Sequence, residues 1–236
     1  MQKILSRVRC AVQEYDMIKS GDKIAVGVSG GKDSLILLIA LCELQRFYPE
    51  KYELIAVIID MQFENMPTNY DEIEKICNKY NIKSVIKRTG LYNVIFNNRK
   101  EKNPCSLCAN MRRGILHNIA KEQGCNKIAL GHHLDDAVET MLMNLFRCGR
   151  AESFRPVTYL SRKDLYMIRP LILTEESDII RITEKQNLPV IESKCIMDKT
   201  SEREKTKQLI ENLEKEYPNL KNNVINALKH GKISGW

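Results

Sequence analysis

The chain has 236 residues, of which 43% are hydrophobic, so it can form one large α/β domain, or one domain with small appendages, around a sizeable core. No apolar run approaches the roughly 18 residues of a membrane span, and no apolar signal region follows the first residues, so we expect neither a membrane protein nor an exported one. The net charge of +7 is compatible with a polyanionic partner and equally with an ordinary charged surface. We therefore expect a cytoplasmic protein whose eight cysteines stay reduced.

The first predicted element is an amphipathic helix at the N-terminus. Apolar residues recur from Ile4 to Ile18 at alternating spacings of four and three, while Lys3, Arg7 and Arg9 lie on the other face. This helix precedes the first predicted strand, so it need not belong to the main sheet. It either packs on the core of the domain or presents its basic face to RNA or to a partner subunit.

A glycine turn, Ser-Gly-Gly-Lys-Asp-Ser at 29–34, lies between two apolar runs. The run at 24–28 is short and rich in β-branched residues, which predicts a buried strand, and the longer run at 35–41 predicts a helix. A strand, a glycine turn and a helix together form a phosphate-binding arrangement. Glycine allows close approach of the backbone, and the start of a helix offers unpaired N–H groups.

The side chains of this turn extend the same chemistry. Lys32 adds a cation, and the hydroxyl groups of Ser29 and Ser34 add hydrogen-bond donors. The carboxylate of Asp33 would repel a phosphate, so we expect a bridging Mg²⁺ there. The string differs from the common G-x-x-x-x-G-K-[ST] loop. It resembles the PP-loop, S-G-G-x-D-S, of the ATP pyrophosphatases, which cleave ATP to AMP and pyrophosphate; the alternative is an ordinary glycine turn.

Alternating strands and helices are predicted along the rest of the chain. Further strands are expected at 53–59, 83–87, 127–130, 166–169 and 189–191. Further helices are expected at 68–80, 108–123, 134–145, 175–187, 201–213 and about 219–230. Irregular segments with several basic residues are expected at 89–104 and 149–165. This order predicts an α/β fold with a doubly wound parallel sheet, an N-terminal helix and a helical C-terminus.

Ligands of such sheets bind beyond the carboxyl ends of the strands. The turn at 29–34, Asp60 and the segment 131–136 each follow a predicted strand, so we expect all three at one edge. We divide the chain into an N-terminal helix at 1–20, an ATP pyrophosphatase domain with a further site at 21–200, and C-terminal helices at 201–236.

The segment 131–136 reads Gly-His-His-Leu-Asp-Asp. Asp135 and Asp136 begin a helix, where the helix dipole favours carboxylates, but they are also candidates for a metal-binding or catalytic pair. His132 and His133 are adjacent and point apart, and the segment lacks H-x-x-x-H spacing, so we do not expect zinc there.

Cys105 and Cys108 form a C-x-x-C motif. Alone, the motif is compatible with a redox pair, with half a zinc site, or with an iron–sulfur site. A second C-x-x-C would favour structural zinc and is absent from the sequence. A redox pair normally follows the first strand of its domain, and this one lies far downstream. A site of three thiolates with one distant cysteine remains, and it would leave one iron of a [4Fe–4S] cluster open to a substrate atom.

With both motifs the chain resembles the tRNA 2-thiocytidine synthetases of the TtcA type, which are iron–sulfur PP-loop enzymes. The resemblance runs from about residue 1 to residue 217 and is carried by the segments 29–34, 104–108, 112–116, 127–136 and 168–171. In that family two cysteines of the C-x-x-C and one later cysteine hold the cluster, which implies Cys105, Cys108 and Cys195 here. Where the family often has a second C-x-x-C, Glu192 stands at its first position, so Cys195 is alone.

The resemblance implies ATP-dependent thiolation of a tRNA base, cytidine to 2-thiocytidine, at position 32. ATP adenylates the C2 oxygen, pyrophosphate leaves, and sulfide carried on the open iron displaces AMP. The residues implied in binding ATP are Ser29, Gly30, Gly31, Lys32, Asp33, Ser34, Asp60 and Gly131, with Mg²⁺ bridging phosphates to carboxylates. The residues implied in catalysis are Asp33, Arg112, Asp135 and Asp136.

Two other functions stay open. One is a PP-loop enzyme without a cluster, such as a tRNA lysidine synthetase or an amide-forming ligase, in which the C-x-x-C is structural or binds zinc. The other is a tRNA-binding module without activity. The expected partners are tRNA, a sulfur donor such as a cysteine desulfurase or free sulfide, and a second copy of the chain in a homodimer. The basic residues expected to contact tRNA phosphates are Arg7, Arg9, Arg150, Arg155, Arg162 and Lys163.

Overall fold

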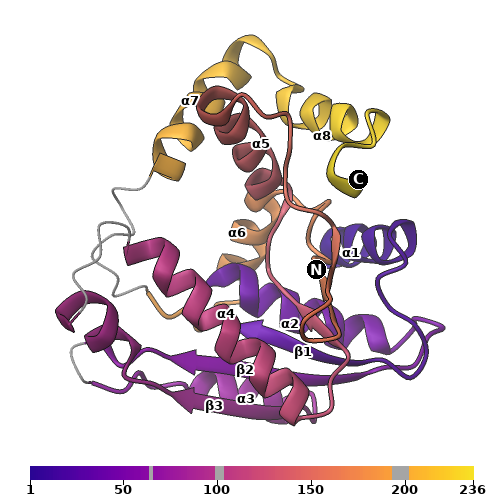
Figure 1. Ribbon diagram of the computed structural model, residues 1–236. Helices are drawn as coiled ribbons and strands as arrows, with labels where there is room; N and C mark the ends of the chain where they lie inside the picture. Colours follow the sequence, from indigo (N-terminus) through magenta and orange to yellow (C-terminus); the bar gives the residue numbers. More distant parts are fainter. Residues whose placement is uncertain (64–65, 99–103, 193–201) are drawn as a thin grey trace.

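Six strands form a single sheet in the order β3-β2-β1-β4-β6-β5 (Figure 1). The computed structural model describes residues 1–63, 66–98, 104–192 and 202–236. The strands are β1 Lys23–Val28, β2 Glu53–Asp60, β3 Lys83–Arg88, β4 Lys127–Ala129, β5 Val157–Leu160 and β6 Leu165–Ile168. The helices are α1 Gln2–Glu14, α2 Lys32–Gln45, α3 Asp71–Lys79, α4 Pro104–Glu122, α5 Leu134–Cys148, α6 Glu176–Lys185, α7 Glu202–Glu216 and α8 Leu220–His230. The structure also has a π-helix at Asn93–Asn98 and a 3₁₀ turn at Ile233–Gly235.

The sheet is parallel from β3 to β6, and only β5 runs antiparallel to its neighbour. The predicted doubly wound parallel sheet is therefore confirmed. Because the parallel strands share one direction, the turns after β1, β2 and β4 emerge at the same edge of the sheet.

Both faces of the sheet are covered by helices, as alternating side chains require. Ile24 and Val26 of β1 face the larger core, which contains α1, α2, α3 and α6. Ala25 faces the smaller core on the other side, which contains α4 (Figure 1). Residues 35–38 of α2 are fully buried, and each contributes about 1.5–3 kcal/mol of apolar burial.

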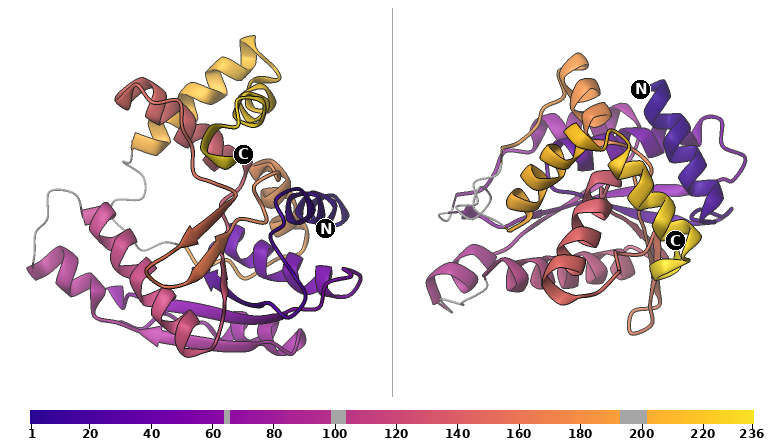
Figure 2. Two further views of the ribbon diagram at one scale, coloured as in Figure 1. Left: turned by 45° about the vertical axis from the view of Figure 1, so that its right-hand side comes forward. Right: turned by 90° about the horizontal axis from the view of Figure 1, so that it is seen from above.

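The C-terminal helices lie beyond the β4–β6 side of the sheet. Figure 2 shows α7 and α8 stacked on α5, away from β1, β2 and β3, and the three helices contact one another. Ile210 of α7 and Ile225 and Leu228 of α8 are buried in the larger core. The C-terminal helices therefore continue the hydrophobic core of the sheet domain.

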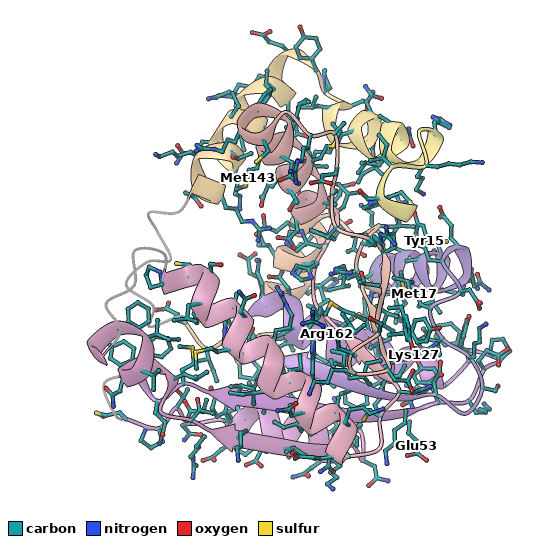
Figure 3. The ribbon with its side chains drawn as sticks, viewed as in Figure 1. Tyr15, Met17, Glu53, Lys127, Met143 and Arg162 are labelled. Carbon is teal, nitrogen blue, oxygen red and sulfur yellow. The ribbon has the colours of Figure 1, made fainter. Side chains whose placement is uncertain are left out.

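The N-terminal connection is tied to the start of β4. Lys127 Nζ pairs with Asp22 at 2.7 Å and donates to the carbonyl of Met17 at 2.9 Å; Figure 3 labels Lys127 and Met17. Both charged side chains are buried, and each compensates the charge of the other. Within the described residues no helix is long and apolar enough to cross a membrane.

Several sequence predictions need correction. The helix expected at 108–123 begins at Pro104, and the segment 89–104, expected to be irregular, contains the π-helix. The segment 149–165 is not irregular throughout, because 157–160 pairs with β6 as a short hairpin. Residues 189–191 do not form a strand: Pro189 has no N–H, and the segment's backbone contact with the glycine turn is a single bond from the N–H of Ile191 to the carbonyl of Gly30. The predicted helix at 68–80 begins only at Asp71, because the N–H of Thr68 donates to the carboxylate of Asp60 instead.

Candidate active site

The glycine turn between β1 and α2 is held closed by its own two serines. The hydroxyl of Ser34 donates to the carbonyl of Gly31 at 2.9 Å and accepts from the N–H of Ser29 at 3.1 Å. The Ser29 hydroxyl accepts from the N–H of Gly31 at 3.3 Å. Because α2 begins at Lys32, the N–H groups of its first turn lie at the open side of this loop, where an anion binds most favourably.

Two glycines are required where other segments approach this loop. Gly30 has a φ of +90°, which favours glycine, and a Cβ there would lie 3.0 Å from the Cβ of Ile191. A Cβ on Gly131, in the turn from β4 to α5, would lie 3.1 Å from the carbonyl carbon of Asp33 and 3.2 Å from the nitrogen of Ser34. The turn after β4 therefore rests directly on the start of α2, backbone against backbone.

Lys32 is held by two carboxylates. Its Nζ lies 2.9 Å from Oε1 of Glu176 at the start of α6 and 3.1 Å from Oδ1 of Asp33. Burial acts to lower the pKa of Lys32, but the charges of Asp33 and Glu176 outweigh it and raise the pKa above its usual value. The other oxygen of Glu176 lies 2.7 Å from Nζ of Lys207 on α7. Burial acts to raise the pKa of Glu176, but hydrogen bonds from Lys207 and Lys32 hold the pKa at about 2.

A cavity of about 850 Å³ opens between the glycine turn and α4. Its wall on the α4 side is one stripe of that helix, at helical spacing: Cys105, Cys108, Arg112 and Leu116. Its opposite wall comes from the glycine turn and the ends of the first two strands, including Ser29, Gly31, Lys32, Asp33 and Asp60. The predicted phosphate site and the predicted thiolate pair thus face one cavity, which also borders on Glu192 and on Arg203 of α7.

The two thiols of the C-x-x-C motif differ in exposure. Cys105 is exposed, whereas Cys108 is 9% exposed and its Sγ lies 3.6 Å from Sδ of Met61. Soft thiolate pairs of this kind are ligands for zinc or for iron–sulfur clusters. Cys195, the third predicted ligand, lies outside the described residues.

Comparison with known proteins agrees with this geometry. Residues 2–213 match the family model described as the PP-loop domain. Over 230 residues the chain is 39% identical to a tRNA-cytidine(32) 2-sulfurtransferase of Geobacter sulfurreducens. The match covers 96% of this chain and 89% of the relative. The chain belongs to the PP-loop family of the tRNA-cytidine(32) 2-sulfurtransferases. A relative of the same name from Syntrophotalea carbinolica is also 39% identical, covering 96% of this chain and 88% of that protein.

A solved structure of the U34-tRNA thiolase NcsA from Methanococcus maripaludis, with its [4Fe-4S] cluster, is similar to this chain with a TM-score of 0.77 at 27% identity. The match covers 95% of this chain and 77% of that one. The family predicted from the glycine turn and the C-x-x-C motif is therefore confirmed, as is its fold.

In this PP-loop chain the carboxylate of Asp60 organises a loop. Asp60 is buried at the end of β2, and its two oxygens accept from the N–H groups of Gln62 at 3.0 Å and Thr68 at 3.1 Å. These bonds fix the start of the loop that carries Met61, which lies against Cys108. Asp60 thus shapes the cavity wall between the phosphate loop and the thiols.

Asp135 and Asp136 are not among the residues that line the cavity. Asp135 accepts from the N–H of Glu176 at 2.7 Å and pairs with Lys221 of α8 at 3.0 Å. Asp136 accepts from the N–H of His133 at 3.0 Å, which caps α5, and pairs with Arg203 at 3.2 Å. In the described part of the chain no group of three or more His, Cys, Asp or Glu side chains is arranged to hold a metal ion.

Sequence reasoning missed three charged residues of this region. Glu176 holds Lys32, Lys207 holds Glu176, and Arg203 lines the cavity. A glutamate in the first turn of a helix is common because the helix dipole favours it, and no spacing in the sequence connects it to Lys32. Only the packing of α6 and α7 on α2 and α5 brings these charges together.

Proposed function

We propose that this protein thiolates a tRNA cytidine at C2, consuming ATP, with a [4Fe–4S] cluster held by Cys105, Cys108 and Cys195. The observation that carries the proposal is the shared cavity: the phosphate loop and both thiols of the C-x-x-C motif line it. The relatives named tRNA-cytidine(32) 2-sulfurtransferase support cytidine 32 as the target. A cysteine desulfurase or free sulfide would supply the sulfur, and the homodimer stays a prediction.

The residues around the thiols fit such a cluster. Cys108 is buried beside Met61 and next to apolar side chains, whereas Cys105 is exposed at the start of α4, so the two thiols lie between an apolar wall and the cavity. A cluster with three protein thiolates supplies an iron that is free to accept sulfide. Glu192 lines the cavity three residues before Cys195, a distance of about 10 Å along an extended chain. Arg203, eight residues after Cys195, lines it as well.

The phosphate end of the cavity would bind and activate ATP. The N–H groups at the start of α2 and the ammonium of Lys32 would hold the triphosphate and counter its charge. Oδ1 of Asp33 is buried and has no hydrogen bond from the described residues, although Lys32 Nζ lies 3.1 Å away. This oxygen would hold a Mg²⁺ ion, which would counter the negative charge of the phosphates.

The adenylation step transfers AMP to the base. The C2 oxygen of the cytidine attacks the α-phosphorus, the bond to the β-phosphate oxygen breaks, and pyrophosphate leaves. Arg112, which lines the cavity one turn beyond Cys108, would stabilise the negative charge that develops on the transferred phosphate. Sulfide then displaces AMP from C2, which restores the aromatic base with sulfur in place of oxygen.

Asp135 and Asp136 would act at a distance from the reacting atoms. Asp135 fixes the start of α6 and therefore Glu176, which in turn holds Lys32. Asp136 fixes Arg203 at the rim of the cavity. A magnesium-binding or proton-transfer role for either aspartate stays a prediction, and the observed contacts favour positioning.

Product analysis tests the proposal. The purified protein is reconstituted anaerobically with iron and sulfide and incubated with unmodified tRNA, ATP and Mg²⁺, and the tRNA nucleosides are analysed by mass. We expect 2-thiocytidine together with release of one pyrophosphate per thiolated base, and neither with the Asp33→Ala variant. Pyrophosphate release that leaves the mass of every cytidine unchanged would contradict the proposed function.

A further inference from the structure

The surface beside the cavity carries a second stripe of α4. Residues that line the cavity occupy one stripe, and Asn110, Arg113, His117 and Lys121 form the neighbouring stripe at the same helical spacing. Arg113 and Lys121 are exposed, and His117 is half-buried. Arg113 follows Arg112 directly, so the second stripe adjoins the cavity wall.

The tip of the β5–β6 hairpin lies on this part of α4. Lys163 Nζ donates to Oδ1 of Asn118 at 2.9 Å, and Lys121 Nζ lies 3.4 Å from the carbonyl oxygen of Asp164. Arg162 precedes Lys163 in the same turn and is exposed; Figure 3 labels its side chain. We call the exposed cations Arg113, Lys121, Arg162 and Lys163 the α4–hairpin surface.

The cations of this surface contact neutral oxygen atoms, whereas cations on other helices pair with carboxylates. The side-chain contacts recorded for Arg113, Lys121 and Lys163 go to amide and carbonyl oxygens of the described residues, not to carboxylates. On α6 and α8, by contrast, Arg181 and Lys221 pair with carboxylates. The only carboxyl group in the hairpin turn, Asp164, accepts from the hydroxyl of Tyr159.

The groups beneath the surface experience the same excess of charge. Burial lowers the pKa of His117, and the charges of Arg113 and Lys163 lower the pKa further. Arg169, at the end of β6, is 7% exposed, and its Nε lacks a hydrogen-bond partner among the described residues. Burial lowers the pKa of Arg169 to about 10, with a further contribution from Arg113. Uncompensated cations so close together are stabilised when an anion binds over them.

We propose that the α4–hairpin surface binds the phosphodiester backbone of the RNA substrate and so guides a base into the neighbouring cavity. The inference rests on the proposed function, and it assigns RNA binding to one surface among the several basic segments of the chain. A row of exposed cations suits a polyanion whose charges recur along its length, and each phosphate bound releases condensed counterions. Its direct continuation into Arg112 and the cavity favours the RNA that is to be modified over an acidic protein.

The test is the salt dependence of tRNA binding by the R113Q/K163Q variant. Both residues are exposed and neither lines the cavity, so ATP binding should stay at the wild-type level. The matched control is K75Q/K79Q, which removes two exposed lysines of α3, on the face of the sheet opposite to α4. We expect R113Q/K163Q to bind tRNA at least tenfold more weakly at moderate salt. The slope of log K against log salt should become shallower by roughly 1.5, or about 0.7–0.9 per lost phosphate contact.

Other outcomes separate this inference from the proposed function. If the wild type thiolates tRNA but R113Q/K163Q binds tRNA with the same affinity and salt slope, or K75Q/K79Q loses as much affinity, then RNA binds elsewhere and the surface assignment is wrong. If the wild type binds ATP but shows no affinity for tRNA, the proposed function is wrong and this inference with it.

Discussion

Lys32 of the phosphate loop and Glu176 of α6 form an ion pair of 2.9 Å, and Lys207 of α7 holds the second oxygen of the same carboxylate at 2.7 Å. Glu176 therefore connects the ATP end of the cavity to the C-terminal helices. The pair also keeps the ammonium of Lys32 ordered before a phosphate arrives, and such preorganisation is worth most in a partly buried site.

Replacing Glu176 with Gln should reduce ATP cleavage. Lys32 would keep its ion pair with Asp33 but lose the one with Glu176, which orients the ammonium group. We therefore expect kcat/KM for pyrophosphate release to fall about tenfold, a loss of roughly 1.4 kcal/mol of transition-state stabilisation. The matched control is Glu175→Gln, because Glu175 precedes Glu176 and its recorded side-chain contact is with Ser177. Equal activity of the two variants would show that Glu176 does not position Lys32.

Gly131→Ala tests the close approach of two backbones. The added methyl group would lie 3.1 Å from the carbonyl carbon of Asp33, so the phosphate loop must shift by a few tenths of an ångström. We expect a loss of about 1–3 kcal/mol of stability from overpacking and a weaker affinity for ATP, measured by chemical unfolding and by equilibrium binding. Gly90→Ala is the control, since a Cβ there meets no atom within 4 Å. Wild-type ATP affinity in Gly131→Ala would contradict the account of this contact.

The sequence predicted the parts of the site that depend on local patterns. The phosphate loop follows from one strand, one turn and one helix, and the position of Arg112 beside Cys108 follows from helical spacing. The position of Cys105 on the same helix was not predicted, because the helix was expected to begin at residue 108. Their meeting at one cavity follows from the shared direction of parallel strands. Contacts such as Lys32 with Glu176 and Asp135 with Lys221 join distant segments, and they depend on how α6 and α8 pack, which no local spacing reveals.

Two short segments escaped correct prediction for a similar reason. β5 has only four residues, follows Pro156, and is stabilised by pairing with β6 more than by its own pattern. Residues 189–191 have the composition of a strand, but the position beside β1 at this edge is already taken by β2 and β4. The segment instead contacts the glycine turn through Ile191 and Gly30.

Glu139 on α5 should make stability depend on pH near neutrality. Burial raises its pKa from 4.5 to about 7, although Arg203 lies 3.2 Å away and opposes the shift. The folded state therefore holds a proton that the unfolded state has lost, and this stabilisation is present below pH 4.5 and lost as the pH rises through 7. The Glu139→Gln variant has no carboxyl group to titrate and does not lose this stabilisation. The stability of the variant relative to the wild type should therefore rise by about 1–2 kcal/mol between pH 5 and pH 8.

Urea unfolding at the two pH values measures this difference. The control is Glu152→Gln, because Glu152 lies on the surface with a 3.6 Å contact to Arg150. Its stability relative to the wild type should be the same at both pH values. A constant difference for Glu139→Gln would show that this carboxyl group titrates normally.

The central claim is that three thiolates hold a cluster at the ATP cavity, and single Cys→Ala variants test it most directly. Each variant is reconstituted anaerobically, its iron and zinc are counted, and 2-thiocytidine is measured in the tRNA product. Changes at Cys105, Cys108 and Cys195 should each abolish iron binding and thiolation, while Cys42→Ala and Cys77→Ala, at buried thiols in the larger core, should retain both. One zinc and no iron in the wild type, with thiolation undiminished, would contradict the claim and leave ATP binding at the phosphate loop intact.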